Sequence, residues 1–384
     1  MRFPEFTEEW KAEQLDNIAT LSKGIGISKE QLSEDGEPCI LYGELYTKYK
    51  SEIIKQVESK TDINGSKLKR SKANDVIIPC SGETAVAIAT ARCVPFDNIL
   101  FGGDLNVISL HQYDGAFMSY QLNGKRKYDI ARVAQGVSIV HLYGEHLKAI
   151  KTYNPTLPEQ QKIAKLLSLL DDRIDTQNKI IEKLQSLIKG LNNTLQYDTG
   201  GKSVCLGDIL LERSERSQTN NQHEVLSSTV KGIFSQREYF SKDIASENNV
   251  GYKIIRLHDV VLSPQNLWMG NINYNDRFEI GIVSPSYKVF SIADGYDNQF
   301  VAAMLKTHRA LYSYMMVSEQ GASIVRRNLN MEAFSQLVFK IPSLDKQREI
   351  GYAISLLKSQ LKTANKIIKA YTSQKQYLLR QMFI

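Results

Sequence analysis

The sequence is poor in the residues that hold together small extracellular or metal-bound folds. Of its 384 residues, only four are cysteines and six are histidines. The cysteines occur singly, with no C-x-x-C pair: Cys39, Cys80, Cys93 and Cys205. His141 and His146 are five residues apart, so they do not share one face of a helix. We therefore expect neither a disulfide framework nor a bound metal, and the cysteine usage is typical of a reducing cytosol.

Long apolar runs are also absent. No stretch of about 18 apolar residues occurs, so the sequence predicts no membrane-spanning helix. The N-terminal residues 1–6 lack the apolar core of a signal peptide. Apolar residues make up 42% and charged residues 23% of the chain, as in an average soluble globular protein. At roughly 100–200 residues per domain, a chain of 384 residues is expected to form two or three domains. We expect a cytoplasmic protein with no membrane partner.

Motifs that carry common enzyme chemistry are missing as well. The chain has no G-x-G-x-x-G after a strand, no N-P-P-Y or D-P-P-Y tetrapeptide for base methylation, and no G-x-S-x-G elbow. Gly201-Lys202-Ser203 resembles the end of a phosphate-binding loop, but Gln196 stands where its first glycine is needed. This segment is better interpreted as a linker that follows a helix. The sequence predicts a protein that is not an enzyme and holds no cofactor of its own.

Positive charge is modest overall and uneven along the chain. The formal net charge is +6, from 48 basic and 42 acidic residues. Residues 340–384 carry nine basic and two acidic residues, a local +7, whereas residues 155–197 carry six and five. The rest of the chain is therefore slightly acidic. This distribution excludes a uniformly basic nucleic-acid-binding surface and leaves only local clusters for such contacts.

An internal repeat is the most informative feature. Residues 155–163 and 342–350 align at an offset of 187 without a gap, as P-T-L-P-E-Q-Q-K-I and P-S-L-D-K-Q-R-E-I. The match continues with S-L-L at 168 and 355 and with N-K-I-I at 178 and 365. So many matches in a row without a gap are not expected by chance.

Each repeated segment predicts a long helix with a coiled-coil seam. Apolar residues recur in steps of four and three, which is the 3.5-residue period of a heptad. The seam positions of the first copy are Ile163, Leu167, Leu170, Ile174, Gln177, Ile181, Leu184, Ile188, Leu191 and Leu195. Those of the second copy are Ile350, Ile354, Leu357, Leu361, Ala364, Ile368, Tyr371, Lys375, Leu378 and Met382. Each helix has about 40 residues, or roughly 60 Å at 1.5 Å per residue.

The segments that precede the two helices match more weakly. The pairs are L-D-N-I at 15 with L-G-D-I at 206, N-D-V-I-I at 74 with H-D-V-V-L at 258, and Q-G-V-S at 135 with Q-G-A-S at 320. These segments contain short predicted strands, such as 75–79 and 282–284, and predicted helices near 116–122 and 298–308. They are therefore expected to mix α-helices and β-strands.

The predicted fold class is α+β, with two similar mixed α/β domains joined by two long helices. Because domain termini often lie close together, the second helix is expected to run back along the first as an antiparallel coiled coil with a pseudo-two-fold repeat. The predicted boundaries are 1–154, 155–197, 198–341 and 342–384. Two similar domains at a fixed distance suit a bipartite ligand, of which DNA is the obvious long periodic example.

With this repeat, the chain resembles the specificity (S) subunit of a type I restriction-modification system. The resemblance rests on two variable domains, each followed by a Pro-x-Leu…Gln-x-x-Ile helix, at 155–163 and 342–350. It implies that each variable domain is a target recognition domain that reads one half of a split DNA sequence, while the helices set the gap. It also implies double-stranded DNA, two methyltransferase (M) subunits and two restriction/translocase (R) subunits as partners. S-adenosylmethionine and ATP/Mg would be used by those partners, and the S subunit itself would be non-catalytic.

Candidate DNA-contacting residues lie in loops after the strands and in short basic clusters. The loops at 81–84 and 265–268 follow equivalent strands and carry side chains that pair with base edges. A glycine-containing loop at 23–28 corresponds to one that faces DNA in the family. The full set is Lys23, Ser28, Tyr42, Lys69, Arg70, Ser81, Glu83, Thr84, Lys125, Arg126, Lys231, Gln265, Asn266, Trp268, Arg326 and Arg327. Each basic cluster has a second interpretation as a solvated face, and Trp268 as a packed side chain.

Two further alternatives stay open. The recurring Q-G-x-S segments at 135 and 320 are the same in both domains, so they are better suited to supporting the fold than to reading different sequences. The whole chain is also compatible with a structural adaptor that joins two protein partners and uses its heptads for dimerisation. Sequence-specific DNA binding that depends on an added methyltransferase subunit separates the two functions.

Overall fold

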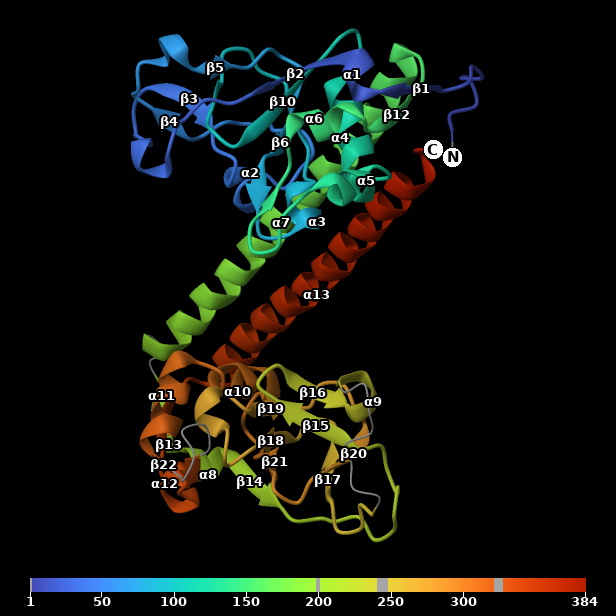
Figure 1. Cartoon of the computed structure of the whole chain (residues 1–384). Coiled ribbons are helices and arrows are strands. Elements are labelled where there is room, and N and C mark those ends of the chain that lie inside the picture. Colours follow the sequence, from blue (N-terminus) through green and yellow to red (C-terminus); the bar gives the residue numbers. More distant parts are fainter. Residues whose placement is uncertain (1, 198–200, 240–247, 321–326) are drawn as a thin grey trace. The chain divides into compact units, whose positions relative to one another are not determined.

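The chain folds into two compact units. The computed structural model describes residues 2–197, 201–239, 248–320 and 327–384 (Figure 1). Residues 1–179 with 366–384 form unit 1, and residues 180–365 form unit 2. The long helices α7 (Leu157–Tyr197) and α13 (Leu344–Gln381) each contribute one part to each unit. The division between the two units falls within both long helices and not at their ends. The domain boundaries predicted from the sequence therefore stay a prediction.

Unit 1 is built on a four-stranded antiparallel sheet in the order β2-β10-β6-β8. Its central strand β6 is buried along its whole length because both faces of the sheet are covered. Val76 and Ile78 pack into one core with the neighbouring helices, and Ile77 packs into a second core on the opposite face. This alternation follows the two-residue period of a strand. A second sheet, in the order β4-β3-β9-β5, supplies the other side of that second core.

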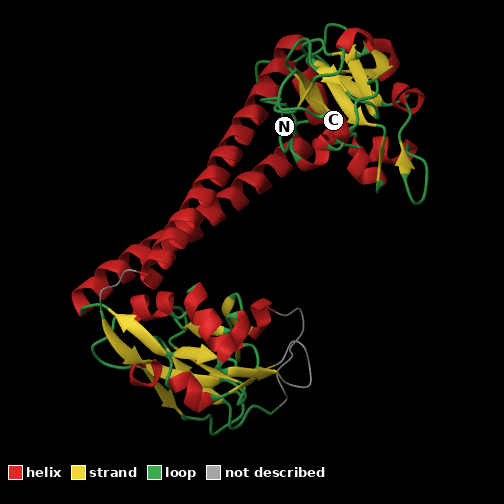
Figure 2. Cartoon of the chain, turned by 90° about the vertical axis from the view of Figure 1, so that its left-hand side faces the viewer, coloured by secondary structure: helices red, strands yellow, loops and turns green. Residues whose placement is uncertain are grey.

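The elements of unit 1 besides the long helices, drawn as strands and helices in Figure 2, are β1 (Lys11–Gln14), α1 (Leu15–Ile18), β2 (Ala19–Lys23), η1 (Lys29–Gln31), β3 (Glu37–Ile40), α2 (Glu44–Thr47), β4 (Lys60–Thr61), η2 (Gly65–Lys67), β5 (Lys69–Arg70), β6 (Asp75–Pro79), β7 (Ser81–Gly82), α3 (Ala85–Ile88), β8 (Arg92–Val94), β9 (Leu100–Phe101), β10 (Leu105–Leu110), α4 (Gly115–Asn123), α5 (Lys127–Val133), β11 (Val140–His141), α6 (Gly144–Lys148) and β12 (Lys151–Asn154).

Unit 2 repeats this plan. Its central sheet has the order β14-β21-β18-β19, strand for strand the equivalent of the sheet in unit 1. Val260 and Leu262 of β18 enter one core and Val261 enters another, as in β6. The internal repeat predicted from the sequence is therefore a repeat of topology as well.

The elements of unit 2 besides the long helices are β13 (Lys202–Cys205), α8 (Leu206–Ile209), β14 (Leu210–Arg213), β15 (Leu226–Thr229), β16 (Gly232–Ser235), α9 (Gln236–Tyr239), β17 (Lys253–Arg256), β18 (Val260–Leu262), η3 (Leu267–Met269), β19 (Ile272–Tyr274), β20 (Ile280–Val283), β21 (Lys288–Ile292), α10 (Asn298–Met304), α11 (His308–Met316), β22 (Ser318–Gln320), β23 (Arg327–Leu329), α12 (Met331–Ser335) and β24 (Val338–Ile341).

A repeated glutamine explains why Gln recurs at the start of both long helices. In unit 1 the Gln160 amide donates to the Pro155 carbonyl (2.8 Å) and accepts from the Asp114 N–H (2.9 Å). In unit 2 Gln347 makes the same two bonds to Pro342 and Asp297, both at 2.9 Å. Asp114 and Asp297 in turn cap helices α4 and α10. The glutamine thus joins each long helix to a capped helix of the same unit, α7 to α4 and α13 to α10.

The predicted coiled-coil seam is confirmed by the burial of the two long helices. Every predicted seam residue whose side chain the structure describes is buried or half-buried, while Leu195 lies outside the described side chains. In unit 1, Ile163, Leu167 and Leu170 of α7 pack with Leu378 and Met382 of α13. The beginning of one helix therefore meets the end of the other, as an antiparallel pair requires.

One helix predicted from the sequence is interrupted. The segment 298–308 does not form a single helix, because α10 ends at Met304 and α11 begins at His308. The Thr307 hydroxyl donates to the Met304 carbonyl (2.9 Å) and accepts from the Ala310 N–H (3.2 Å). This cap begins a new helix and ends the old one. The helix expected at 116–122 is present as α4.

Candidate nucleic-acid interface

In unit 1, the loop that follows the central strand lies beside the turn that begins at Gln135. Ser81 and Gly82 form the short strand β7, which pairs with His141 and Val140 of β11. Gln135 closes the turn through hydrogen bonds with His141 in both directions. The candidate loop 81–84 and the turn 135–141 therefore form one continuous surface, although they are far apart in the sequence.

Local hydrogen bonds fix the shape of this surface. The Ser81 hydroxyl donates to Asp104 (2.9 Å), and the Thr84 hydroxyl caps α3 by accepting from the Ala87 N–H. Gly136 has φ +120°, and a Cβ there would lie 2.1 Å from the Ile139 carbonyl oxygen, so only glycine fits. Ser81 and Thr84 thus position the loop. Glu83 is exposed and forms no hydrogen bond or ion pair with a described residue.

Aromatic side chains lie beside Ser81 of this loop, and most of them were not predicted from the sequence. The Lys23 ammonium lies 5.8 Å from the centre of the Tyr143 ring, which stacks on His141 at 6.1 Å. The Tyr46 hydroxyl donates to the Ser81 carbonyl (3.2 Å). Rings of this kind beside a lysine suit stacking on, or packing against, a nucleic acid. Their only signal in the sequence was their place next to candidate residues.

Two other candidates of unit 1 are exposed, each next to a short helix. Tyr42 is 39% exposed and precedes α2, the helix that carries Tyr46. Ser28 is exposed at the start of η1, where its backbone N–H donates to the Gln31 side chain (2.9 Å). The loop before it is held close to the strand end at residues 101–103, since a Cβ on Gly24 would lie 2.0 Å from the Gly102 carbonyl oxygen.

In unit 2, four candidate residues come together in the equivalent place. The Arg327 N–H donates to the carbonyl of Gln265 (3.1 Å). The Arg327 guanidinium also lies 5.1 Å from the centre of the Trp268 ring. Asn266 directly precedes the short helix η3, which carries Trp268. Arg326 and the segment 321–323 lie outside the described residues.

The two units therefore present equivalent loops with different side chains. In unit 1 the loop 81–84 begins in β7, which pairs with β11, and in unit 2 Gln265 accepts from the Arg327 backbone N–H. The repeated glutamines are paired through the backbone as well, Gln135 with His141 and Gln320 with Arg327. The two glutamines thus make equivalent pairings, while the side chains of the loops differ.

In the basic clusters of unit 1, the two arginines form ion pairs within the unit. Arg70 forms a bidentate ion pair with Glu37, at 2.6 and 2.9 Å, while Lys69 beside it is half-buried. Arg126 pairs with Asp129 (3.1 Å) and donates to the carbonyl of Ile384 (2.9 Å). Lys125 is exposed next to it. Phosphate contact by these four residues stays a prediction.

Among the described residues, no group of three or more His, Cys, Asp or Glu side chains is placed to hold a metal ion, and no helix is long and apolar enough to cross a membrane. Burial raises the pKa of the Cys39 and Cys80 thiols to about 11 and that of Cys93 to about 12. These thiols are protonated at neutral pH and are not activated nucleophiles.

Known proteins share this architecture. The S subunit of a type I restriction-modification system from M. genitalium is similar with a TM-score of 0.65 and 17% sequence identity, covering 100% of this chain and 97% of that one. A chain from a structure on complex assembly and conformational transition of the type I R-M system has a TM-score of 0.51 and 13% identity, covering 98% and 97%. At these identities the likeness shows the fold.

The fold is thus that of a type I specificity subunit, with two mixed α/β units and two long helices that pack together. Residues 7–186 match the family described as type I restriction modification DNA specificity domain. They belong to that family, and the resemblance drawn from the repeat is confirmed.

Proposed function

We propose that this chain is the sequence-specific DNA-binding subunit of a type I restriction-modification complex, and that each recognition domain reads one half of a bipartite target. The observation that carries the proposal is the pair of equivalent loops with different side chains. Glu83 stands in one loop, and Gln265 with Asn266 in the other. A glutamate accepts from cytosine, whereas Gln and Asn pair with adenine, so equivalent loops with these residues suit different half-sites.

The long helices supply the second part of the proposal, which is that they set the gap and dock two methyltransferase subunits. Leu169 and Ile180 of α7 lie outside the seam and are 47% and 44% exposed. Their repeat equivalents in α13, Leu356 and Ile367, are 45% and 37% exposed. Residues eleven apart share a helix face, so each helix presents the same apolar pair. Two equal surfaces suit two copies of one partner.

The chemistry is assigned to the partners. The chain is proposed to be non-catalytic and to hold no cofactor. The methyltransferase subunits would use S-adenosylmethionine, and restriction/translocase subunits, where they join, would use ATP and Mg²⁺. The purified chain alone should neither cleave nor methylate DNA.

Mapping methylated positions in DNA tests the proposed reading. The chain is co-expressed with its cognate methyltransferase subunit, as wild type and with Glu83→Ala or Gln265→Ala. Each substitution should relax the sequence requirement in one half of the target and leave the other half unchanged. Glu34→Ala is the control, because Glu34 is an exposed carboxylate in unit 1 outside the loop. Relaxation of both halves by one substitution, or methylation of no defined sequence by the wild type, would refute the proposal.

A further inference from the structure

Unit 2 contains a cavity with a strong excess of positive charge. Its volume is about 640 Å³, and it lies where the β15–β16 hairpin, α10 and β19 meet α13. The charged side chains that line it are Lys231, Asp276, Arg277, Lys306, Lys358 and Lys362. Arg277 is paired with Glu238 at 2.6 Å. Four lysines and one aspartate are left facing the cavity.

The four lysines are only partly offset by Asp276, since burial lowers the pKa of Lys358 in spite of the charge of that carboxylate. None of Lys231, Lys306, Lys358 and Lys362 forms an ion pair with a described residue. The Lys306 ammonium donates only to neutral acceptors, the Gly270 carbonyl (2.7 Å) and the Asn273 side chain (2.8 Å). Burial, and then the charge of Lys358, lowers the pKa of Lys306 to about 8. The site therefore concentrates like charges at an energetic cost that an anion would relieve.

The repeat shows what occupies the same place in unit 1. The ungapped alignment of the two long helices matches Lys358 and Lys362 of α13 with Asp171 and Asp175 of α7. Asp171 pairs with Lys375 (2.6 Å) and accepts from the Tyr120 hydroxyl (2.7 Å). The helix residues are thus acidic in unit 1 and basic in unit 2.

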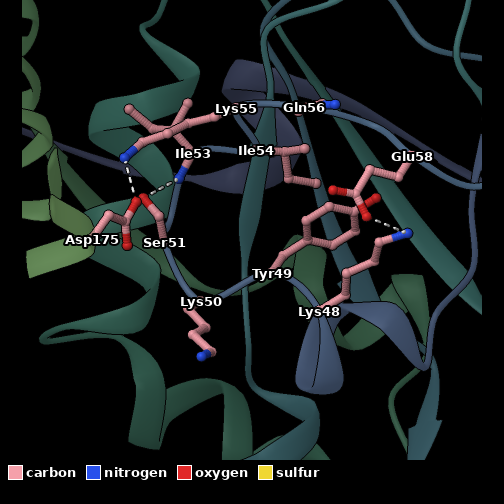
Figure 3. Close-up of a pocket in the computed structure, with 10 residues that line it drawn as sticks. All are labelled: Lys48, Tyr49, Lys50, Ser51, Ile53, Ile54, Lys55, Gln56, Glu58 and Asp175. Atoms are coloured by element: carbon pink, nitrogen blue, oxygen red, sulfur yellow. Dashed lines mark hydrogen bonds and ion pairs between the residues drawn. The ribbon is translucent and has the colours of Figure 1, made fainter. Parts of the chain in front are cut away.

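The side of the unit that faces these helix residues corresponds as well. In unit 1, the segment after β3 runs beside β8 through an Ile53–Cys93 bridge and carries Lys55. Lys55 pairs with Asp172 and Asp175, both at 2.7 Å, and Figure 3 shows the contact with Asp175. In unit 2, the segment after β15 forms β16 beside β19 and carries Lys231. Unit 1 therefore places acids of α7 at this position, whereas unit 2 places Lys358 and Lys362 there and has Asp276 as the acid that faces four lysines.

We propose that this cavity binds a phosphate group of the DNA backbone. The proposal rests on the proposed function, because it assumes that the chain binds DNA. Several ammonium groups with three N–H donors each suit a tetrahedral anion with several oxygens. Lys231 and Lys362 are exposed, so the lining is open to a duplex. Such a contact holds the backbone without reading sequence, and it is present in only one of the two units.

The first arm of the test makes α13 resemble α7. The double variant Lys358→Asp/Lys362→Asp gives unit 2 the acids that unit 1 has, so Lys231 and Lys306 gain internal partners and the thermal midpoint should stay the same or rise. The matched control is Lys366→Asp/Lys369→Asp, with the same charge change at exposed positions of the same helix outside the cavity. A second cavity variant, Lys231→Gln/Lys358→Gln, replaces the first if that one fails to fold.

DNA affinity of the complex with the methyltransferase subunit is then measured against salt concentration. Loss of one phosphate contact should lower the slope of log affinity against log salt by about 0.9. The cavity variants should show this change equally on target and random duplexes, and the control should not. If the cavity variants and the control had equal slopes, the effect would come from the overall charge of the chain, and the proposal would be wrong.

Two further probes separate other ligands. If inorganic phosphate raises the thermal midpoint of the wild type but the duplex slope is unchanged in the cavity variants, the site binds a free phosphate compound and the DNA proposal is wrong. If DNA binding is normal but co-purification with the methyltransferase subunit is lost, the ligand is a protein carboxylate and the proposal is again wrong. Failure of the proposed function is seen separately, as absence of sequence-specific binding by the wild type.

Discussion

Gln160 and Gln347 make the same two buried hydrogen bonds in the two units. Both side chains are almost fully buried, at 1% and 2% exposure. A buried N–H or carbonyl without a partner costs about 1–3 kcal/mol. The physical reason for the repeated glutamine is therefore the satisfaction of two backbone groups where a long helix meets its unit.

Substitution of this glutamine should destabilise its unit. We expect Gln160→Leu to lower the free energy of unfolding by about 2–4 kcal/mol, because the Asp114 N–H and the Pro155 carbonyl lose their partners. Gln161→Leu is the matched control, since Gln161 is its exposed neighbour on the same helix. Urea unfolding measures both. An equal effect of the two substitutions would contradict the role given to Gln160.

The pKa of Lys306, lowered to about 8, predicts a stability that depends on pH. Between pH 8 and the ordinary lysine value near 10.5, the unfolded chain holds a proton on this amine that the folded chain has lost. Stability of the wild type should therefore rise by about 2 kcal/mol relative to Lys306→Met from pH 7 to pH 10. The other charged groups that face Lys306 are Lys231, Asp276, Arg277, Lys358 and Lys362. A difference between the two proteins that does not vary with pH would contradict the lowered pKa.

At the scale of elements, the long helices could be predicted from the sequence and most strands could not. A heptad repeat is a local pattern, so ten seam positions in each of α7 and α13 could be predicted from the sequence. Strand β6 was predicted at 75–79 from its apolar run, although both of its faces are buried and it shows no alternation. The strands β7 and β11 have only two residues each and carry no such signal. The break between α10 and α11 escaped prediction because it depends on one threonine cap at Thr307.

The candidate site divides in the same way. The loops 81–84 and 265–268 could be predicted because each follows a strongly apolar strand. Tyr143 and His141 could not, since they join Ser81 only through the pairing of β7 with β11, a strand from a distant part of the sequence. The basic cavity of unit 2 brings Lys231, Lys306 and Lys358 together from three distant segments.

Register of the seam is the property of α7 that can be tested directly. Insertion of four residues after Gln177 shifts the following seam positions by half a heptad. Leu184 and Ile188 would then turn away from α13, and we expect a lower thermal midpoint and loss of target methylation. Insertion of seven residues at the same place in α7 and after Ala364 in α13 keeps the register and serves as control. A four-residue insertion that is tolerated as well as the control would show that the seam does not hold the helices together.

At the scale of the whole molecule, the account depends on a division of labour. The repeated residues build the scaffold of each unit and the seam of the helices, while the loops that differ are proposed to read different half-sites. Insertions in loops leave the seam unchanged, whereas insertions in a heptad repeat break its register. This difference explains why the two helices align at one constant offset without a gap, while the offsets in the preceding segments vary.

Removal of one heptad from each helix tests the central claim most directly. Deletion of Gln177–Lys183 and Ala364–Ala370 keeps the seam in register and spares Asp175, Lys362, Tyr371 and Lys375, which contact the units. Each helix shortens by roughly 10.5 Å, or about three base pairs at 3.4 Å each. Methylated positions are mapped on a target library with gaps of varied length. We predict unchanged half-sites with a gap shorter by about three base pairs, or loss of methylation because the two domains no longer face the duplex in phase. A shortened protein that methylates the wild-type gap as before would contradict the claim that the helices set the distance.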